Sequence, residues 1–199
     1  GGMGAVHKVK DRLTGDIVAL KQVSIPPTDL RFAARIKTNP EKSYIALTRE
    51  FQTLAGLRHP NIISVLDYGY DDKHQPFYTM EYIKDHIDIH QFSLSIGVNA
   101  KVHLLIQLLQ GLAYLHRRQI VHKDLKPGNI MVVDDCIKVL DFGLAIIQQE
   151  VDVTQTSTIT GTIPYMAPEL LFQKDASIAS DLYAVGVIAY QMFSGNHPF

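Results

Sequence analysis

The sequence has one cysteine, no visible secretory leader and no apolar run long enough to cross a bilayer. Because Cys136 is alone, no disulfide can form within the chain, and a reducing compartment, the cytoplasm, fits best. No basic stretch followed by an apolar core opens the chain, as a signal peptide would require. The most apolar run, residues 182–193, is too short to span a membrane and predicts a buried helix.

The chain also lacks a charge bias, with 19 basic against 20 acidic residues. This balance gives no reason to expect a nucleic acid or an anionic membrane surface as a partner. With 199 residues, 46% of them hydrophobic, the chain can bury a core as one unit or two small lobes. Its start at Gly1, without an initiator methionine, and its abrupt end at Phe199 lead us to expect a piece of a longer protein with further domains.

The first part of the chain is predicted to be mainly sheet with one helix. Glycine, proline and β-branched patterns place a turn at Thr14-Gly15 and a surface connection, read as an insertion, at 24–43. The predicted strands are 5–9, 16–23, 62–68 and 77–82, and helical spacing covers 44–57.

The second part is predicted to be mainly helical. Residues 101–116 read as an amphipathic helix that Asn99 can cap, and Asp134-Asp135 reads as a hairpin turn between strands 130–133 and 137–140. The fold class is therefore α+β: a small strand-rich lobe (1–82), a connector (83–90) and a helical lobe (91–199). The residues expected on one apolar face of the helix 101–116 are Val102, Leu105, Ile106, Leu109 and Leu112.

Two features near the N-terminus suggest phosphate binding. The run Gly1-Gly2-Met3-Gly4 lets backbone amides approach phosphate oxygens, although a glycine-rich turn before a strand can equally be a simple hairpin. Lys21 ends an apolar strand, and Glu50 lies beside the apolar stripe of its helix, where a carboxylate needs a cation. Lys21 is one such partner. Alternatively, Lys21 lies in water at the edge of the sheet, and Glu50 lies in water at the rim of the apolar stripe.

The strongest chemical signal is the run 122–129, HKDLKPGN, followed by Asp141-Phe142-Gly143. Two acidic groups and an amide lie in short loops that flank one hairpin, which brings them together. Phosphoryl transfer uses a carboxylate to orient the attacking hydroxyl and oxygen ligands for magnesium. The ordered combination argues against a chance run of polar loop residues.

These motifs resemble those of eukaryotic-type serine/threonine protein kinases, with a style similar to bacterial members. HKDLKPGN looks like the catalytic loop and DFG like the magnesium-binding motif. VALK at 18–21 resembles the strand with the phosphate-binding lysine, and GTIPYMAPE at 161–169 the segment that forms the substrate pocket. The first glycine of the phosphate loop, its strand and the last helices are absent, so the resemblance is to a kinase domain truncated at both ends.

The resemblance implies a role for each matching residue. Asp124 is the expected base, Lys126 steadies the transferring phosphate, and Asn129 and Asp141 hold the metal. Asp181 braces the catalytic loop, and Thr162 contacts the catalytic aspartate. The nucleotide-binding set comprises Gly1, Gly2, Met3 and Gly4 over the phosphates, Lys21 positioned by Glu50, Val6, Ala19 and Met131 around adenine, Met80 as gatekeeper, and Glu81 and Ile83 at the hinge.

The implied cofactors are ATP and Mg²⁺, with Mn²⁺ as a substitute, and the implied partners are proteins with serine or threonine acceptors. Lys126 and Thr162 favour hydroxyl amino acids other than tyrosine. A pseudokinase that only binds nucleotide stays open as an alternative, although Lys21, Asp124, Asn129 and Asp141 are all present. A small-molecule kinase of related fold fits less well, because the segment 161–169 serves protein substrates in this family.

Two stretches depart from the family pattern. Lys123 stands where many members have an arginine that binds an activation-loop phosphate, and lysine cannot grip two oxygens at once. We therefore expect activation to depend less on loop phosphorylation. The stretch 85–90, DHIDIH, alternates as a metal-binding strand could, although a solvated connector is the plainer interpretation.

Overall fold

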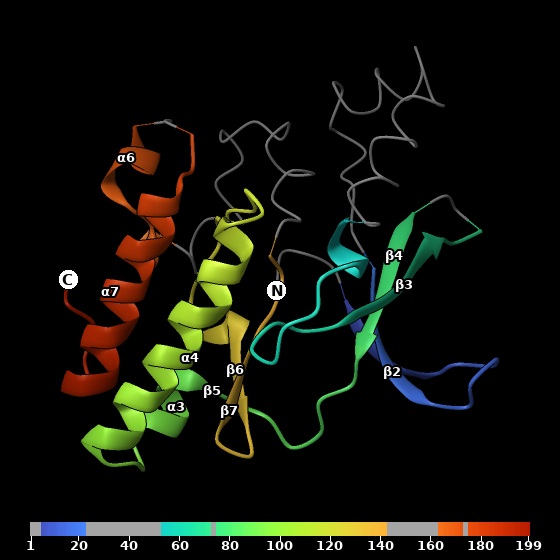
Figure 1. Cartoon of the computed structure of the whole chain (residues 1–199), viewed down its shortest axis with the longest axis horizontal. Helices are drawn as coiled ribbons and strands as arrows, with labels where there is room; N and C mark the ends of the chain where they lie inside the picture. Colours follow the sequence, from blue (N-terminus) through green and yellow to red (C-terminus); the bar gives the residue numbers. More distant parts are fainter. Residues whose placement is uncertain (1–4, 23–52, 73–74, 143–162, 173–174) are drawn as a thin grey trace. The chain divides into compact units, whose positions relative to one another are not determined.

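The computed structural model describes residues 5–22, 53–72, 75–142, 163–172 and 175–199. These residues form two units (Figure 1). The first unit contains the described residues within 1–58 and 63–84. The second contains 59–62 and the described residues within 85–145 and 154–199. The predicted lobe boundaries at 82–83 and 90–91 stay predictions.

The first unit is built on a four-stranded antiparallel sheet in the order β1-β2-β4-β3. The turn between β1 and β2 is closed by Asp11, whose Oδ1 accepts the N–H of Leu13 at 2.7 Å, and by Gly15 at φ 81°. The strands are β1 (Val6–Lys10), β2 (Ile17–Gln22), β3 (Val65–Tyr70) and β4 (Pro76–Glu81), close to the four ranges predicted from the sequence. Of the predicted helix 44–57, only the last residues are described, helical at 53–55.

The second unit combines a three-stranded sheet, in the order β5-β6-β7, with two long helices. The predicted hairpin between β6 and β7 is confirmed: Val133 pairs with Cys136, and Asp134 and Asp135 have φ of 48° and 59°. Its elements are β5 (Ile87–Asp88), α3 (Ile89–Ser93), α4 (Val98–His116), η1 (Pro127–Asn129), β6 (Ile130–Val133), β7 (Cys136–Val139), η2 (Ile163–Tyr165), α6 (Pro168–Leu171) and α7 (Ile178–Ser194).

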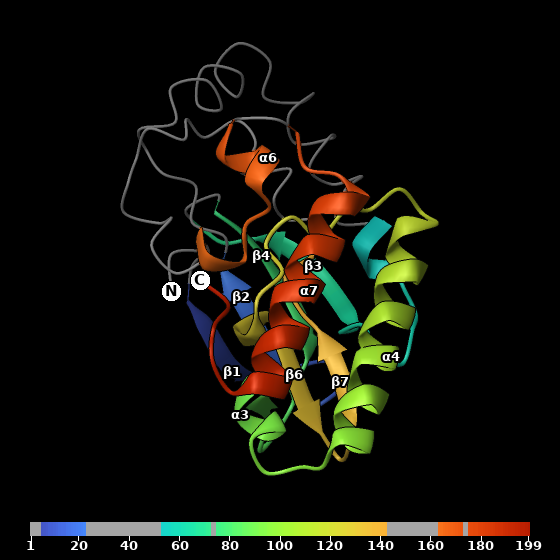
Figure 2. The same ribbon diagram turned by 90° about the vertical axis from the view of Figure 1, so that its left-hand side faces the viewer.

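Helices α4 and α7 lie side by side, and the β6–β7 hairpin packs against α4 (Figures 1 and 2). Helix α7 begins with a capping box, in which Ser177 and Ser180 each satisfy the other's backbone N–H. It ends at Gly195, whose φ of 78° a residue with a Cβ adopts at a cost. Both ends of α7 are therefore set by local sequence.

The prediction for α4 is correct as a helix and wrong in its details. The helix begins earlier than expected, with Gly97 as its N-cap, so Asn99 lies inside it and caps nothing. The expected apolar face is also wrong, because Val102, Ile106 and Leu109 are exposed. The helix is apolar on more than one side, so spacing alone did not identify the buried one. The residues that it buries are Leu104, Gln107, Leu108, Gly111, Leu112 and Leu115.

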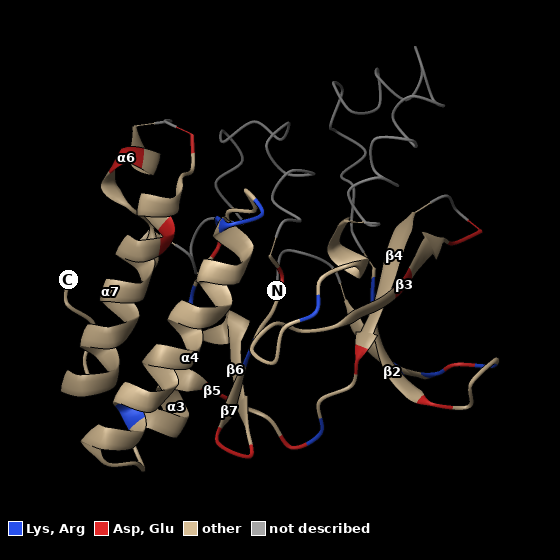
Figure 3. Cartoon of the chain, viewed as in Figure 1, with Lys and Arg blue, Asp and Glu red and all other residues tan. Residues whose placement is uncertain are grey.

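Helix α7 confirms the predicted helix at 182–193, but it is not buried on every side in the part of the chain that the structure describes. Ala184, Val187 and Ile188 are buried, whereas Leu182 and Tyr190 are about half exposed, at 48% and 53%. The neighbours that contact it, α3, α4 and η2, cover only part of its surface. Figure 3 shows that α4 and α7 carry almost no Lys, Arg, Asp or Glu.

The stretch 85–90 forms a short strand and the start of a helix. The Oδ1 of Asp88 accepts the N–H groups of His90 and Gln91 at 2.9 and 3.0 Å and so caps α3. The described residues contain no group of three His, Cys, Asp or Glu side chains suited to a metal ion. Within the same residues, no helix has both the length and the hydropathy that a membrane crossing requires.

Candidate active site

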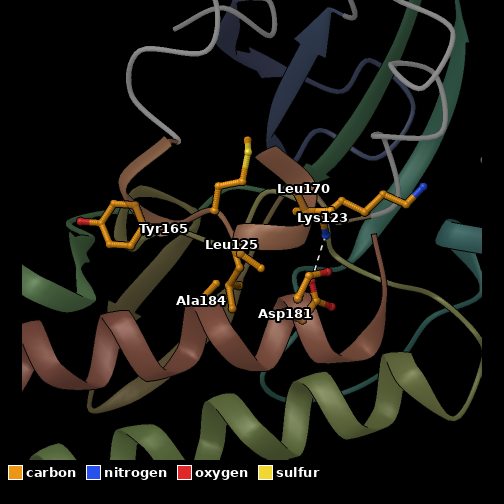
Figure 4. Close-up of a pocket in the computed structure, with 9 residues that line it drawn as sticks. Lys123, Leu125, Tyr165, Leu170, Asp181 and Ala184 are labelled. Atoms are coloured by element: carbon orange, nitrogen blue, oxygen red, sulfur yellow. Dashed lines mark hydrogen bonds between the residues drawn. The ribbon is translucent and has the colours of Figure 1, made fainter. Parts of the chain in front are cut away.

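The loop segment 122–129 is anchored through its backbone to one buried carboxylate. Asp181, in the first turn of α7 and 2% exposed, accepts the N–H of His122 at 2.8 Å. Its carboxylate accepts the N–H of Lys123 at 3.0 Å (Figure 4). It also accepts the Nε2–H of His116 on α4 at 2.8 Å. A carboxylate is favoured at a helix N-terminus, where backbone N–H groups point outward. The predicted bracing role of Asp181 is confirmed.

His122 connects this loop to the strand that precedes Asp141. Its side chain is fully buried; Nε2–H donates to the carbonyl of Leu140 at 2.8 Å, and Nδ1 accepts the N–H of Asp124 at 3.4 Å. Both bonds require the neutral ring with its proton on Nε2. Burial lowers the pKa of His122, although Asp181 and Asp124 oppose the shift. The neutral ring of His122 therefore links the loop that carries Asp124 to the residue that precedes Asp141.

The structure brings together three of the predicted catalytic side chains. The Oδ2 of Asp124 accepts from Nζ of Lys126 at 2.8 Å and from Nδ2 of Asn129 at 3.1 Å. The same Nδ2 donates to the backbone carbonyl of Asp124 at 2.7 Å, which closes the loop on itself. Asp124 is 8% exposed and Asn129 6%, so both are held in one arrangement. The ammonium of Lys126 beside this carboxylate can stabilise negative charge that shifts from one oxygen to another during a reaction.

Asn129 and Asp141 are brought near each other by the hairpin between them. Ile130 pairs with Val139, and the N–H of Leu140 donates to the carbonyl of Asn129 at 2.9 Å, one residue before Asp141. Asp141 has φ of 58°, a left-handed conformation that is rare for a residue with a Cβ and is common at functional sites. Amide and carboxylate oxygens are the ligands that Mg²⁺ accepts, so this pair fits the implied metal.

In the first unit, four predicted nucleotide-binding residues share one face of the sheet. Lys21 lies opposite Val6 on β1, and Ala19 lies opposite Met80 on β4. Directly opposed residues point to the same side, and residues two apart along a strand do as well. Lys21 is only 4% exposed, so its side chain is buried rather than extended into water.

The hinge candidates follow at the end of β4. Glu81 pairs with Ser64 twice: its N–H donates to the Ser64 carbonyl at 3.1 Å, and its Oε1 accepts the Ser64 N–H at 3.0 Å. Ile83 follows the strand and is partly exposed. Met131 belongs to the second unit, on β6 between Asp88 and Lys138. The roles of all three stay predictions.

Several predicted site residues lie outside the described part of the chain. They are Gly1, Gly2, Met3, Gly4, Glu50 and Thr162. The predicted pairing of Lys21 with Glu50, the glycine cover over the phosphates and the contact of Thr162 with Asp124 therefore remain predictions.

A small pocket lies where the loop segment meets α7 and residues 165–167 (Figure 4). Tyr165 beside it donates to Oε1 of Gln191 at 2.8 Å, and burial raises the pKa of its phenol. Part of the segment that resembles a substrate pocket thus packs within the same unit as Asp124. The lining residues are Lys123, Leu125, Tyr165, Met166, Ala167, Leu170, Ser180, Asp181 and Ala184.

Sequence reasoning missed three polar residues that support this site, of which Asn61 and Gln107 are buried. His116 is the third partner of Asp181, and Asn61 and Gln107 hold the outer edge of β7. Each lies far in the sequence from the residue that it contacts. A polar residue on the buried side of a helix, as Gln107 is on α4, is the one signal that could have been noticed.

Comparison with known proteins gives consistent matches. A family model described as "Protein kinase domain" matches residues 1–199. Serine/threonine-protein kinase pkn3 of Myxococcus xanthus is 35% identical over 211 residues, covering 100% of this chain and 37% of its own length. The probable serine/threonine-protein kinase PknB of Lactococcus lactis is 31% identical over 207 residues, covering 100% and 31%. The chain thus spans about a third of these relatives.

Among solved structures, a crystal structure of Rad53 residues 1–466 in complex with AMP-PNP matches with a TM-score of 0.74 and 28% identity. The match covers 100% of this chain and 47% of that one. Similarity in sequence and similarity in fold therefore point to the same group of proteins.

Proposed function

Because this chain belongs to the protein kinase domain family, we propose that the protein transfers the γ-phosphate of ATP to serine and threonine hydroxyls of other proteins. Family membership and the match to Rad53 also confirm the predicted resemblance and the α+β, kinase-like fold class. The proposal is supported above all by Asp124 Oδ2, which lies 2.8 Å from Nζ of Lys126 and 3.1 Å from Nδ2 of Asn129.

In this proposal Asp124 orients the acceptor hydroxyl and takes its proton as the oxygen attacks the γ-phosphorus, while the bond between the β- and γ-phosphates breaks and ADP leaves. Lys126, already beside that carboxylate, contacts the transferring phosphate and offsets its charge. Asn129 and Asp141 would hold Mg²⁺, which when bound would neutralise charge on the phosphates. Lys21 binds the nucleotide phosphates from the buried face of β2. The backbone bonds of Asp181 keep the loop in place throughout.

The proposed substrates are proteins with serine or threonine acceptors, which follows from Lys126 in the loop segment and from the names of the relatives. The cytoplasm is the proposed compartment, since ATP is supplied there and the exposed Cys136 is a free thiol. Further domains are proposed as well, because the relatives are about three times longer than the match.

The first prediction tests the transfer itself. Full-length protein, Mg²⁺, labelled ATP and a generic protein acceptor should yield phosphoserine and phosphothreonine. Asp124→Asn should lower kcat by roughly 10²- to 10⁴-fold, because the base is lost. Its affinity for ATP should change little. Phosphoamino-acid analysis and nucleotide titration measure both quantities.

Asp134→Asn, in the exposed turn of the same hairpin, is the matched control and should retain full activity. Unchanged turnover in Asp124→Asn would contradict the assigned role. If the wild-type protein binds ATP but transfers no phosphate, a nucleotide-binding scaffold is the better description.

A further inference from the structure

The strand that leads to Asp141 has an outer edge held by two side-chain amides. One edge of β7 pairs with β6; on the other edge, the described residues form no further strand, only an isolated bridge between Ile62 and Val139. There, the N–H of Ile137 donates to Oε1 of Gln107 at 2.9 Å, and its carbonyl accepts from Nδ2 of Asn61 at 3.3 Å. The N–H of Val139 donates to the backbone carbonyl of Asn61 at 2.9 Å. Two residues thus replace a neighbouring strand.

These two amides also bind each other and the hairpin turn. Nδ2 of Asn61 donates to Oε1 of Gln107 at 2.9 Å, and Nε2 of Gln107 donates to the carbonyl of Asp135 at 3.0 Å. Asn61 is 5% exposed and Gln107 is 7% exposed. Buried amides are costly unless their donors and acceptors are paired, and these are paired. The network therefore permits one position of β7 along α4.

The close approach of α4 to this point is visible at Gly111. A Cβ at Gly111 would lie 3.3 Å from the carbonyl oxygen of Asn61 and 3.3 Å from the Ile62 side chain. Asn61 is in turn held by His59, whose Nδ1 accepts its N–H at 3.1 Å. The turn 59–62 and α4 thus clamp β7 from the side opposite to β6.

The clamp lies directly before the predicted metal ligands. After Val139, the N–H of Leu140 binds the carbonyl of Asn129, and Asp141 follows at φ 58°. A strained residue keeps its conformation only where its surroundings over-determine it. We infer that Gln107 and Asn61 are positioning residues: by fixing the register of β7, they hold Asp141 beside Asn129 in the geometry that a divalent metal requires. This inference rests on the proposed metal-dependent function of those two residues.

A purely structural role for the network predicts a different result. If Gln107 only fills the core, its replacement lowers the free energy of unfolding and leaves the metal affinity of the folded protein unchanged. If Gln107 positions Asp141, the metal affinity falls in protein that remains folded. Residues that orient metal ligands typically contribute about 10- to 100-fold in affinity.

The test compares Gln107→Met with Gln110→Met in the full-length protein. Gln110 is an exposed residue of the same helix, so the exchange there is matched in chemistry. With Mn²⁺ and a non-hydrolysable ATP analogue, electron paramagnetic resonance measures the metal Kd. Gln107→Met should raise that Kd about 10-fold or more, and Gln110→Met should not change it. In kinetic assays kcat should fall at low Mg²⁺ and recover partly at high Mg²⁺.

A second readout needs neither metal nor activity. In the protein without ligands, amide hydrogen exchange at Ile137 and Val139 should be faster in Gln107→Met than in Gln110→Met. Gln107→Glu keeps an oxygen that accepts from Ile137 and Asn61, but it loses the donor to Asp135 and places a carboxylate beside that carbonyl. It should therefore also raise the Mn²⁺ Kd and speed the exchange, and it is the second comparison if Gln107→Met fails to fold.

An unchanged Mn²⁺ Kd in folded Gln107→Met and Gln107→Glu would overturn the inference, whatever the rate of phosphate transfer. Conversely, a wild-type protein that binds Mn²⁺ and nucleotide but transfers no phosphate would contradict the proposed function and leave the positioning role supported by the metal affinities.

Discussion

At the scale of single residues, His122 shows how a titratable side chain is used for its neutral form. It is fully buried, accepts one N–H and donates to one carbonyl, so a second ring proton would face the N–H of Asp124. Burial accordingly lowers its pKa. The loop that carries Asp124 and the strand before Asp141 are linked by this neutral ring.

The second prediction concerns the pH dependence of this link. Above the ordinary pKa of 6.5, His122 is neutral in both the folded and the unfolded chain. Below it, the unfolded chain binds a proton that the folded chain does not, so the free energy of unfolding falls, by at most about 1.4 kcal/mol per pH unit. The loss continues until the lowered pKa of the folded state is reached.

Denaturant unfolding between pH 7 and pH 5 measures this effect. His122→Gln, which cannot titrate, should show a shallower loss of stability than the wild type. His103→Gln, exposed on α4, is the control and should follow the wild type. Equal slopes in the wild type and His122→Gln would contradict the assignment.

At the scale of elements, the sequence predicted the strands and turns well because their signals are local. Alternating apolar residues and a glycine at Gly15 fix β1 and β2, and Asp134-Asp135 fixes the β6–β7 hairpin. The buried side of α4 was predicted wrongly, because its apolar residues lie on several sides and the choice depends on what packs against it. Gln107 faces inward since Asn61 and β7 supply its partners.

The third prediction tests the hairpin turn. Asp135 has φ of 59°, a conformation that costs residues with a Cβ energy and costs glycine none. Its side chain is exposed, and only its carbonyl takes part in the amide network. Asp135→Gly should therefore raise the free energy of unfolding by about 1 kcal/mol.

Thermal or denaturant unfolding checks this change. Asp16→Gly is the matched control, since Asp16 is exposed in another turn and is not among the described residues with positive φ. At position 16 glycine relieves no strain and adds conformational freedom to the unfolded chain, so the free energy of unfolding should not rise. A loss of stability in Asp135→Gly would mean that the aspartate side chain itself supports the turn.

At the scale of the whole molecule, the contiguous motifs were enough to predict the family and the group around Asp124. HKDLKPGN lies in one loop, and its three polar side chains meet as expected. The support beneath them was only partly predictable. Asp181 was anticipated by resemblance, whereas His116 and the Asn61–Gln107 pair depend on contacts between distant segments. Such contacts leave no pattern in a single sequence.

A further prediction concerns control of the whole enzyme. Lys123, at φ 71° and bound through its N–H to Asp181, stands where the family resemblance leads us to expect an arginine. Lysine carries a compact point charge, whereas the planar guanidinium of arginine can bind two phosphate oxygens at once, so lysine binds a phosphate less specifically. If the full-length protein has the proposed transferase activity, we expect it to retain most of that activity when Thr154, Thr156, Ser157, Thr158 and Thr160 are all changed to alanine.

Labelled-ATP assays with the same acceptor protein check this result. Asp124→Asn provides the inactive reference for the assay. Activity of the five-alanine variant near that reference would show that loop phosphorylation is required after all. If the lysine form is independent of phosphorylation as expected, Lys123→Arg should increase the dependence, because a guanidinium can bind two phosphate oxygens at once.

The four residues 59–62 belong to the second unit, although their neighbours on both sides in the sequence belong to the first. No single cut can therefore separate the chain into two complete halves. A fragment that begins at residue 85 would lack Asn61, and the carbonyl of Ile137 and the N–H of Val139 on the outer edge of β7 would be open to pairing with another chain. Such a fragment should aggregate when expressed alone. A peptide that spans 59–62 would supply Asn61 again and should reduce this aggregation.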